Sequence, residues 1–110
     1  MNTKLILLDG AKGAGKSTIS NLLKDNLNNT AFIGLDLIRH LITKSKATDD
    51  FNKIAFDIIF LMVNSFLSNG ISVVVDSGIN KERLNKLREI SLNNKASIFM
   101  FMKFNNLKIF

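Results

Sequence analysis

The chain has 110 residues, a length typical of a single domain. Its hydrophobic fraction of 46% is that of a globular protein and excludes a disordered chain. The absence of cysteine excludes disulfide bonds and thiolate metal sites, and it fits a reducing cytoplasm. The longest uninterrupted apolar run, residues 58–63, is far too short to cross a membrane, and the sequence shows no signal peptide. We therefore expect a cytoplasmic protein with no membrane contact.

The net charge of +6 suits an anionic ligand such as a nucleotide or a nucleic acid. The same basicity also follows from composition alone, because Lys, Asn and Ile are abundant and Arg is scarce, as AT-rich coding produces. We favour the compositional interpretation and keep nucleic acid as a second hypothesis for a partner.

Short apolar runs alternate with helical patterns along the chain. A buried strand is predicted over residues 4–9, ending at Gly10, and a helix over residues 17–27. A second strand is predicted over residues 31–35, followed by a short helix over residues 36–43.

A long helix is predicted next. Either Asp49 or Asp50 can cap it, and its apolar residues form one stripe from Phe51 to Leu67. The helix should end at Asn69-Gly70, a common C-terminal signal.

The last third of the chain repeats the alternation. The β-branched run 71–76 predicts a third strand, Asn80 can cap a helix over residues 81–93, and residues 96–104 predict a fourth strand. This order favours an α/β three-layer fold, in which a parallel sheet of about four strands has helices on both faces. No linker or repeat interrupts the pattern, so residues 1–110 are expected to form one domain.

The strongest motif reads GAKGAGKS and matches G-x-x-x-x-G-K-[ST] in full. Its glycines let successive backbone N–H groups face phosphate oxygens, and the following helix adds its partial positive charge. Lys16 should reach the β- and γ-phosphates, and the Ser17 hydroxyl should bind Mg²⁺. The expected phosphate-binding segment consists of Gly10, Ala11, Lys12, Gly13, Ala14, Gly15, Lys16, Ser17 and Thr18.

Acidic residues follow two of the predicted strands. Asp76 ends the third strand, where a carboxylate can hold Mg²⁺ opposite Ser17 or can merely turn the chain. Asp36 and Arg39 follow the second strand and share a face if this segment is helical. Asp36 can accept a proton and Arg39 can bind an anionic acceptor, or the two can be a helix cap and a solvated arginine. Spacing alone leaves that choice open.

The P-loop, the D-x-x-R motif at Asp36 and Arg39, and the strand-end Asp76-Ser77-Gly78 together resemble one group of P-loop kinases. This group contains polynucleotide 5′-hydroxyl kinases, zeta-toxin-like kinases and adenylylsulfate kinases, and the likeness extends over about residues 3–104. It implies that Lys16 and Ser17 bind ATP and Mg²⁺. It also implies that Asp36 is the base or orienter of the acceptor hydroxyl, with Arg39 on the acceptor and Asp76 near the metal.

The resemblance also implies the strand order 2-3-1-4, with the P-loop after the central strand. Members of the group continue past the fourth strand into a lid helix, whose arginines reach the transferring phosphoryl group, and a fifth strand. The chain is therefore expected to be a C-terminally truncated domain whose fourth strand is an open edge that can pair with a second copy.

The leading functional hypothesis is an ATP-dependent kinase that transfers the γ-phosphoryl group to a hydroxyl of a small molecule or of a nucleic-acid 5′ end. Its cofactors would be ATP and Mg²⁺. Two alternatives stay open: a catalytically weak or inactive nucleotide-binding module, because the lid is missing, and a nucleic-acid-binding regulator that uses the positive charge.

Overall fold

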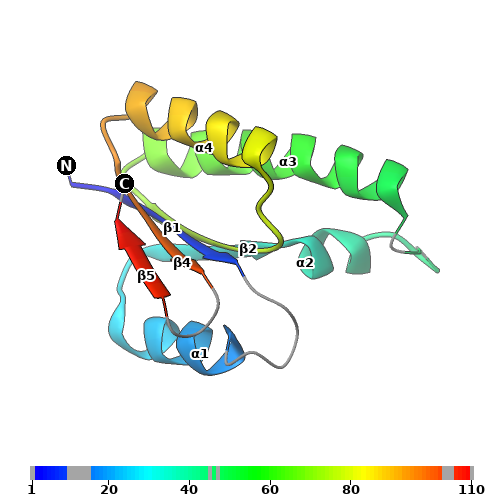
Figure 1. The fold of residues 1–110 in the computed structure, drawn as a ribbon, viewed down its shortest axis with the longest axis horizontal. Coiled ribbons are helices and arrows are strands. Elements are labelled where there is room, and N and C mark those ends of the chain that lie inside the picture. The colour runs from blue at the N-terminus through cyan, green and yellow to red at the C-terminus, as the bar shows by residue number, and fades with distance from the viewer. Residues whose placement is uncertain (1, 10–15, 45, 47, 103–105, 110) are drawn as a thin grey trace.

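The computed structural model describes residues 2–9, 16–44, 46, 48–102 and 106–109. Strands and helices alternate along most of this chain (Figure 1). The elements are β1 (Lys4–Asp9), α1 (Lys16–Asn26), β2 (Thr30–Gly34), α2 (Leu35–His40), α3 (Asp49–Ser68), β3 (Ser72–Asp76), α4 (Lys81–Asn93), β4 (Ser97–Met102) and β5 (Asn106–Ile109).

The five strands form one sheet in the order β2-β3-β1-β4-β5. The first four strands are parallel, so the predicted order 2-3-1-4 is confirmed, with β1 between β3 and β4. Leu5 of β1 pairs with Val73 on one side and Ile98 on the other. Both faces of β1 are buried, which explains why this strand is a continuous apolar run without a polar alternation.

Helices cover both faces of the sheet, as predicted. Figure 1 shows α3 and α4 side by side on one face and α1 on the other. The larger core lies under α3 and α4, where Ile59 and Val63 of α3 and Leu87 of α4 pack against Leu5 and Leu7 of β1. A smaller core lies under α1 and joins Ile6, Leu8 and Val74 to partly buried side chains of that helix.

The start of α3 differs from the prediction. Thr48 is the N-cap, and its Oγ1 accepts a hydrogen bond from the backbone N of Phe51 at 3.2 Å. Asp49 and Asp50 lie in the first turn, where a carboxylate interacts favourably with the helix dipole. A threonine hydroxyl can accept a hydrogen bond from the same first-turn N–H groups as an aspartate carboxylate, so the cap lies one residue earlier than the two predicted candidates.

The apolar stripe of α3 is also split. Ala55, Ile59 and Val63 are fully buried, whereas Ile54 and Ile58 lie on the exposed side of the helix. The stripe is wider than the surface that the sheet and α4 can cover. By length and composition α3 could cross a membrane, with a mean hydropathy of 1.3, but core helices of soluble proteins have the same composition. One face of α3 packs on the sheet, and 28% of this apolar window is buried in all.

The edge of β4 is not open where we expected it to be. The antiparallel strand β5 pairs with it from Phe99↔Ile109 to Met102↔Asn106. The predicted fourth strand over residues 96–104 is therefore shorter, and the expected pairing edge for a second copy is occupied by the chain's own C-terminal segment. A four-residue strand gives little periodicity, and so the sequence did not indicate it.

Candidate active site

The carboxyl ends of β1, β2 and β3 meet at one edge of the sheet. Asp76, the last residue of β3, lies in register between Leu8 of β1 and Gly34 of β2. Ligands of open parallel sheets bind outside these ends. The predicted site residues Asp36 and Asp76 therefore lie at this edge, together with Asp9, which ends β1.

The P-loop residues Gly10 to Gly15 lie outside the described residues, as do the side chains of Lys16, Ser17 and Thr18. The described chain confirms the flanking elements: β1 ends at Asp9, and α1 begins at Lys16. A strand and a helix joined by this glycine-rich segment are the context that the motif requires.

Asp36 and Arg39 lie on α2, which begins directly after β2. The predicted common face is confirmed, because Arg39 Nη2 donates a hydrogen bond to Asp36 Oδ1. The Asp36 side chain is 61% exposed and that of Arg39 is 26% exposed, so the pair is open to a ligand. The helix ends at His40, three residues earlier than predicted.

Ser77, which follows Asp76, is buried and connects two strands. Its Oγ accepts a hydrogen bond from the backbone N of Leu35 at 2.8 Å and donates one to the Asp76 carbonyl oxygen at 2.6 Å. Its backbone N donates to the carbonyl oxygen of Leu8 at 3.3 Å. The start of α2 is thereby attached to the end of β3.

Asp9 attaches the segment that follows β3 to the end of β1. Its Oδ1 accepts a hydrogen bond from the backbone N of Ile79 at 3.1 Å. Sequence analysis did not single out Asp9 or the Ser77 side chain. Both act on backbone groups far away in the chain, and the only local signal was the position of Asp9 immediately before the P-loop.

Arg83 holds the same segment from the side of α4. Its Nη1 donates to the carbonyl oxygen of Gly78 at 3.0 Å, and its guanidinium lies 4.0 Å from the centre of the Phe56 ring on α3. The cation–π contact fixes this guanidinium against the core. Arg83 thus supports the segment that follows β3, and the Phe56 ring covers one face of its guanidinium.

The described residues contain no cluster of three or more His, Cys, Asp or Glu side chains that could hold a metal ion. A Mg²⁺ that serves a nucleotide does not require one, because it takes one or two protein ligands and completes its shell with phosphate oxygens and water. Asp76 and Asp9, at the ends of adjacent strands, offer the hard oxygen ligands that Mg²⁺ prefers. The residues present at this edge fit that ion.

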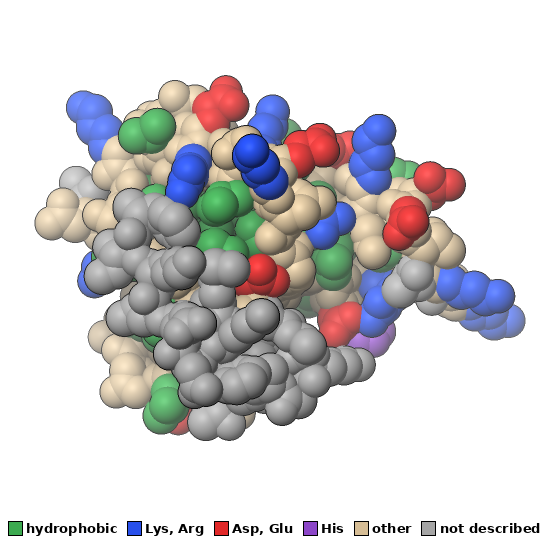
Figure 2. Space-filling view, viewed as in Figure 1, with side chains coloured by type: hydrophobic (Ala, Val, Ile, Leu, Met, Phe, Trp, Pro, Cys, Tyr) green, Lys and Arg blue, Asp and Glu red, His purple; other side chains and the backbone are tan. Residues whose placement is uncertain are grey.

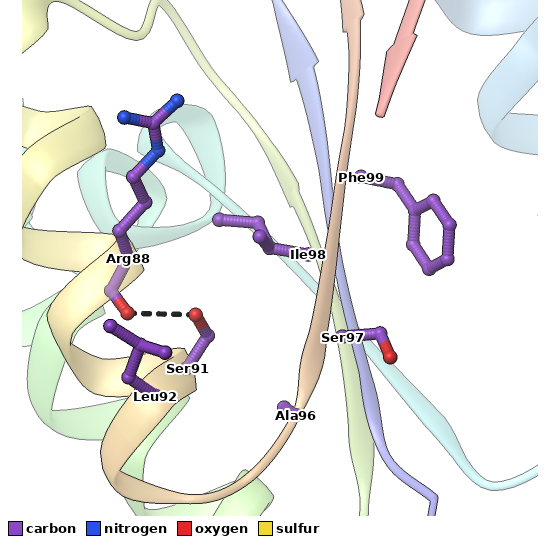
Figure 3. A pocket seen from close by; sticks show the side chains of 7 residues that line it. All are labelled: Arg88, Ser91, Leu92, Ala96, Ser97, Ile98 and Phe99. Atoms are coloured by element: carbon purple, nitrogen blue, oxygen red, sulfur yellow. Dashed lines mark hydrogen bonds between the residues drawn. The ribbon is translucent and has the colours of Figure 1, made fainter. Parts of the chain in front are cut away.

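A separate hollow of about 520 Å³ lies between the end of α4 and the start of β4. Figure 3 shows Arg88, Ser91 and Leu92 on the helix facing Ile98 on the strand. This hollow lies at the amino end of the parallel strands, since Ser97 pairs with Lys4 at the start of β1. It is therefore at the opposite end of the sheet from the edge where β1, β2 and β3 end.

Charge is mixed on the face that Figure 2 shows. Lys and Arg side chains alternate with Asp and Glu side chains over α3 and α4 and do not gather in one basic patch. On this face the distribution agrees with the compositional interpretation of the net charge of +6.

The parallel order 2-3-1-4, with a glycine-rich loop between the central strand and a helix, defines a P-loop kinase fold. A family model described as Zeta toxin matches residues 2–96. The chain belongs to the zeta toxin family, one of the members named in the resemblance. A comparison with curated proteins found no match.

Solved structures share the fold at low identity. The chain is similar to a protein in the Pnkp1/Rnl/Hen1 RNA repair complex, with 21% identity, a TM-score of 0.76, and coverage of 93% of this chain and 33% of that one. It is also similar to a sugar kinase from Janibacter sp. HTCC2649, with 17% identity, a TM-score of 0.65, and coverage of 92% and 60%. A third similar structure is the Mycobacterium tuberculosis APS kinase CysC in complex with AMPPNP and APS, with 18% identity, a TM-score of 0.61, and coverage of 92% and 62%. The chain thus spans from a third to about three fifths of the length of these proteins.

Proposed function

We propose that the protein is an ATP-dependent kinase that transfers the γ-phosphoryl group to a hydroxyl acceptor. The observation that carries the proposal is the hydrogen-bonded pair of Asp36 and Arg39 on α2, directly after β2. It lies at the edge of the sheet where β3 ends at Asp76 and β1 ends at Asp9. A carboxylate and a guanidinium that are exposed at the phosphate-binding edge suit an acceptor better than they suit a structural role.

In this proposal the P-loop backbone and Lys16 bind the β- and γ-phosphates. Asp36 accepts the proton of the acceptor hydroxyl while that oxygen bonds to the γ-phosphorus and the bond to the β-phosphate oxygen breaks, so ADP leaves. Arg39 holds Asp36 in place from one side and binds an anionic group of the acceptor from the other. We include residues 1–110 in one kinase domain.

Ser17 and Asp76 are the proposed protein ligands of Mg²⁺, which when bound neutralises charge on the phosphates. The proposed phosphate-binding segment remains Gly10 to Thr18. An activity that uses ATP and Mg²⁺ in this way also supports a cytoplasmic protein, as the absence of cysteine does.

The similar structures suggest three acceptor classes to test. One of them belongs to an RNA repair complex, one is a sugar kinase, and one holds APS together with AMPPNP. A first panel therefore contains a 5′-hydroxyl RNA oligonucleotide, a set of monosaccharides and APS, each incubated with [γ-³²P]ATP and Mg²⁺.

We expect transfer of ³²P to at least one acceptor and a loss of about 10²–10⁴-fold in kcat for Asp36→Asn, the usual effect of losing a general base. The KM for ATP should stay within about twofold, because Asp36 lies outside the P-loop. Lys16→Ala should abolish transfer and weaken the binding of a fluorescent ATP analogue. Unchanged kcat in Asp36→Asn would contradict the proposed role of this carboxylate.

A nucleotide-binding module without turnover is the second candidate. It requires only the strand and the helix that flank the P-loop, which are β1 and α1. Binding of the ATP analogue that depends on Lys16, together with no ³²P transfer to any acceptor of the panel or to water, would replace the kinase proposal with this one.

A further inference from the structure

We propose that Ser77 is a positioning residue, which sets the place of Asp36 relative to Asp76 by capping helix α2 from another strand. This inference rests on the proposed phosphoryl transfer, in which Asp36 faces the acceptor. It assigns a role to a buried serine that lies outside both the P-loop and the D-x-x-R motif.

Helix α2 has no local cap. Its N-cap is Gly34, which has no side chain to accept a hydrogen bond from the first turn. The N–H of Leu35, the first helical residue, instead donates to Ser77 Oγ at 2.8 Å. A cap supplied by β3 fixes the start of the helix to the sheet as well as satisfying the N–H group.

The hydroxyl of Ser77 is itself held firmly. It is 4% exposed, and it donates to the Asp76 carbonyl oxygen at 2.6 Å, so its acceptor lone pairs are directed at Leu35. The backbone N of Ser77 is bonded to Leu8 of β1. Ser77 therefore connects the ends of β1 and β3 to the start of α2.

Gly34 allows β2 to approach this closely. A Cβ at this position would lie 2.5 Å from the Asp76 carbonyl oxygen, a distance that would force the two strand ends apart. The ends of β2 and β3 are therefore held together in two ways: Gly34 lets the backbones approach, and the Ser77 hydroxyl bonds to the residue after Gly34. We call this contact the joint between β2 and β3.

Asp36 directly follows Leu35, whose N–H is held by Ser77 Oγ. Loss of the anchor should let the start of α2 move relative to Asp76 while the P-loop stays unaffected. A displacement of about 1 Å between reacting groups can cost about 10²-fold in rate. Ser77 should therefore affect kcat through Asp36 and leave nucleotide binding unchanged.

The test measures ³²P transfer from [γ-³²P]ATP by the full chain to water or to whichever acceptor of the panel the wild type phosphorylates. For Ser77→Ala we expect kcat to fall about 10- to 100-fold, with the KM for ATP within about twofold of wild type. In an Asp36→Asn background, Ser77→Ala should cause no further loss beyond about twofold, because both changes remove the same function.

Ser72 provides a matched control at the other end of the same strand. Its Oγ likewise accepts a hydrogen bond from a neighbouring strand, from the backbone N of Lys4 at 2.9 Å. Ser72→Ala removes the same kind of bond far from Asp36, so its kcat should equal that of the wild type. Gly34→Ala keeps the hydroxyl but crowds the joint, and it should lower kcat as Ser77→Ala does.

The outcomes separate the two proposals. If the wild type transfers no ³²P, the proposed function fails, and this inference fails with it. If the wild type transfers ³²P in a manner that requires Asp36, but Ser77→Ala keeps its kcat or lowers it equally in the Asp36→Asn background, only the inference is overturned. Should Ser77→Ala not fold by circular dichroism, Ser77→Cys takes its place with the same expected direction, because a thiol is a weaker acceptor of similar size.

Discussion

At the scale of single residues, the Asp36–Arg39 pair is expected to contribute little to the stability of the fold. The side chain of Asp36 is 61% exposed and that of Arg39 is 26% exposed, so solvent partly screens their attraction. Exposed ion pairs of this kind contribute about 0–1 kcal/mol to stability. A pair that contributes so little to stability, at the edge where three strands end, fits the proposed role of Asp36 and Arg39 in binding the acceptor.

We therefore predict that Arg39→Gln lowers the free energy of unfolding by less than about 1 kcal/mol. Urea denaturation monitored by circular dichroism measures this value. Ile59→Ala is the reference, because Ile59 is fully buried in the core and its truncation should cost about 2–5 kcal/mol. An Arg39→Gln variant as unstable as Ile59→Ala would make Arg39 a structural residue.

At the scale of elements, the sequence predicts the start of helix α4 from its N-cap residue. Asn80 was predicted as the cap of the helix over residues 81–93, and its Oδ1 accepts a hydrogen bond from the backbone N of Arg83 at 2.8 Å. This cap also matters for the candidate site, because residues 77–79 lie between Asp76 at the end of β3 and the cap at Asn80. A local sequence signal therefore marks where the segment that follows β3 ends.

Asn80→Ala should lower the free energy of unfolding by about 1 kcal/mol, the usual cost of losing an N-cap side chain. Thermal or urea unfolding measures the change. Asn85→Ala is the matched control, because Asn85 is exposed within the same helix and alanine has the higher helix propensity there. Equal effects of the two substitutions would show that the Asn80 hydrogen bond contributes nothing to stability.

The same elements show what the sequence could predict. Periodicity and strand composition predicted the four parallel strands, because these signals lie within short segments, whereas the strand order was implied by the resemblance to P-loop kinases. The Leu35–Ser77 and Asp9–Ile79 hydrogen bonds join residues 42 and 70 positions apart, so no local pattern contains them. The pairing of β5 depends in the same way on the free edge of β4, and a short segment does not show where it will pair.

At the scale of the whole molecule, the chain carries a net charge of +6, and on the face seen in Figure 2 the Lys and Arg side chains lie among Asp and Glu side chains. A protein that binds nucleic acid through its backbone releases counterions, and each phosphate contact on a single strand contributes about −0.7 to the slope of log K against log salt. A mixed surface makes few such contacts at once.

We predict a shallow slope, weaker than about −2, for binding to a single-stranded RNA oligonucleotide between 50 and 200 mM salt, roughly three contacts or fewer. Fluorescence anisotropy with a labelled oligonucleotide measures it, and an oligonucleotide with a 5′-phosphate serves as the comparison for one with a 5′-hydroxyl. A slope near −4 or steeper would favour the nucleic-acid-binding regulator instead.

The central place of β1 in the sheet has a consequence for how the chain is made. Leu5 pairs with Val73 and Ile98, so the strand that precedes the P-loop has no partner until most of the chain has left the ribosome. At roughly 5–20 residues per second, this apolar strand stays unpaired for several seconds of synthesis. The strand that precedes the P-loop is thus among the first to be synthesised and among the last to be enclosed, so its apolar side chains stay exposed on the nascent chain during this time.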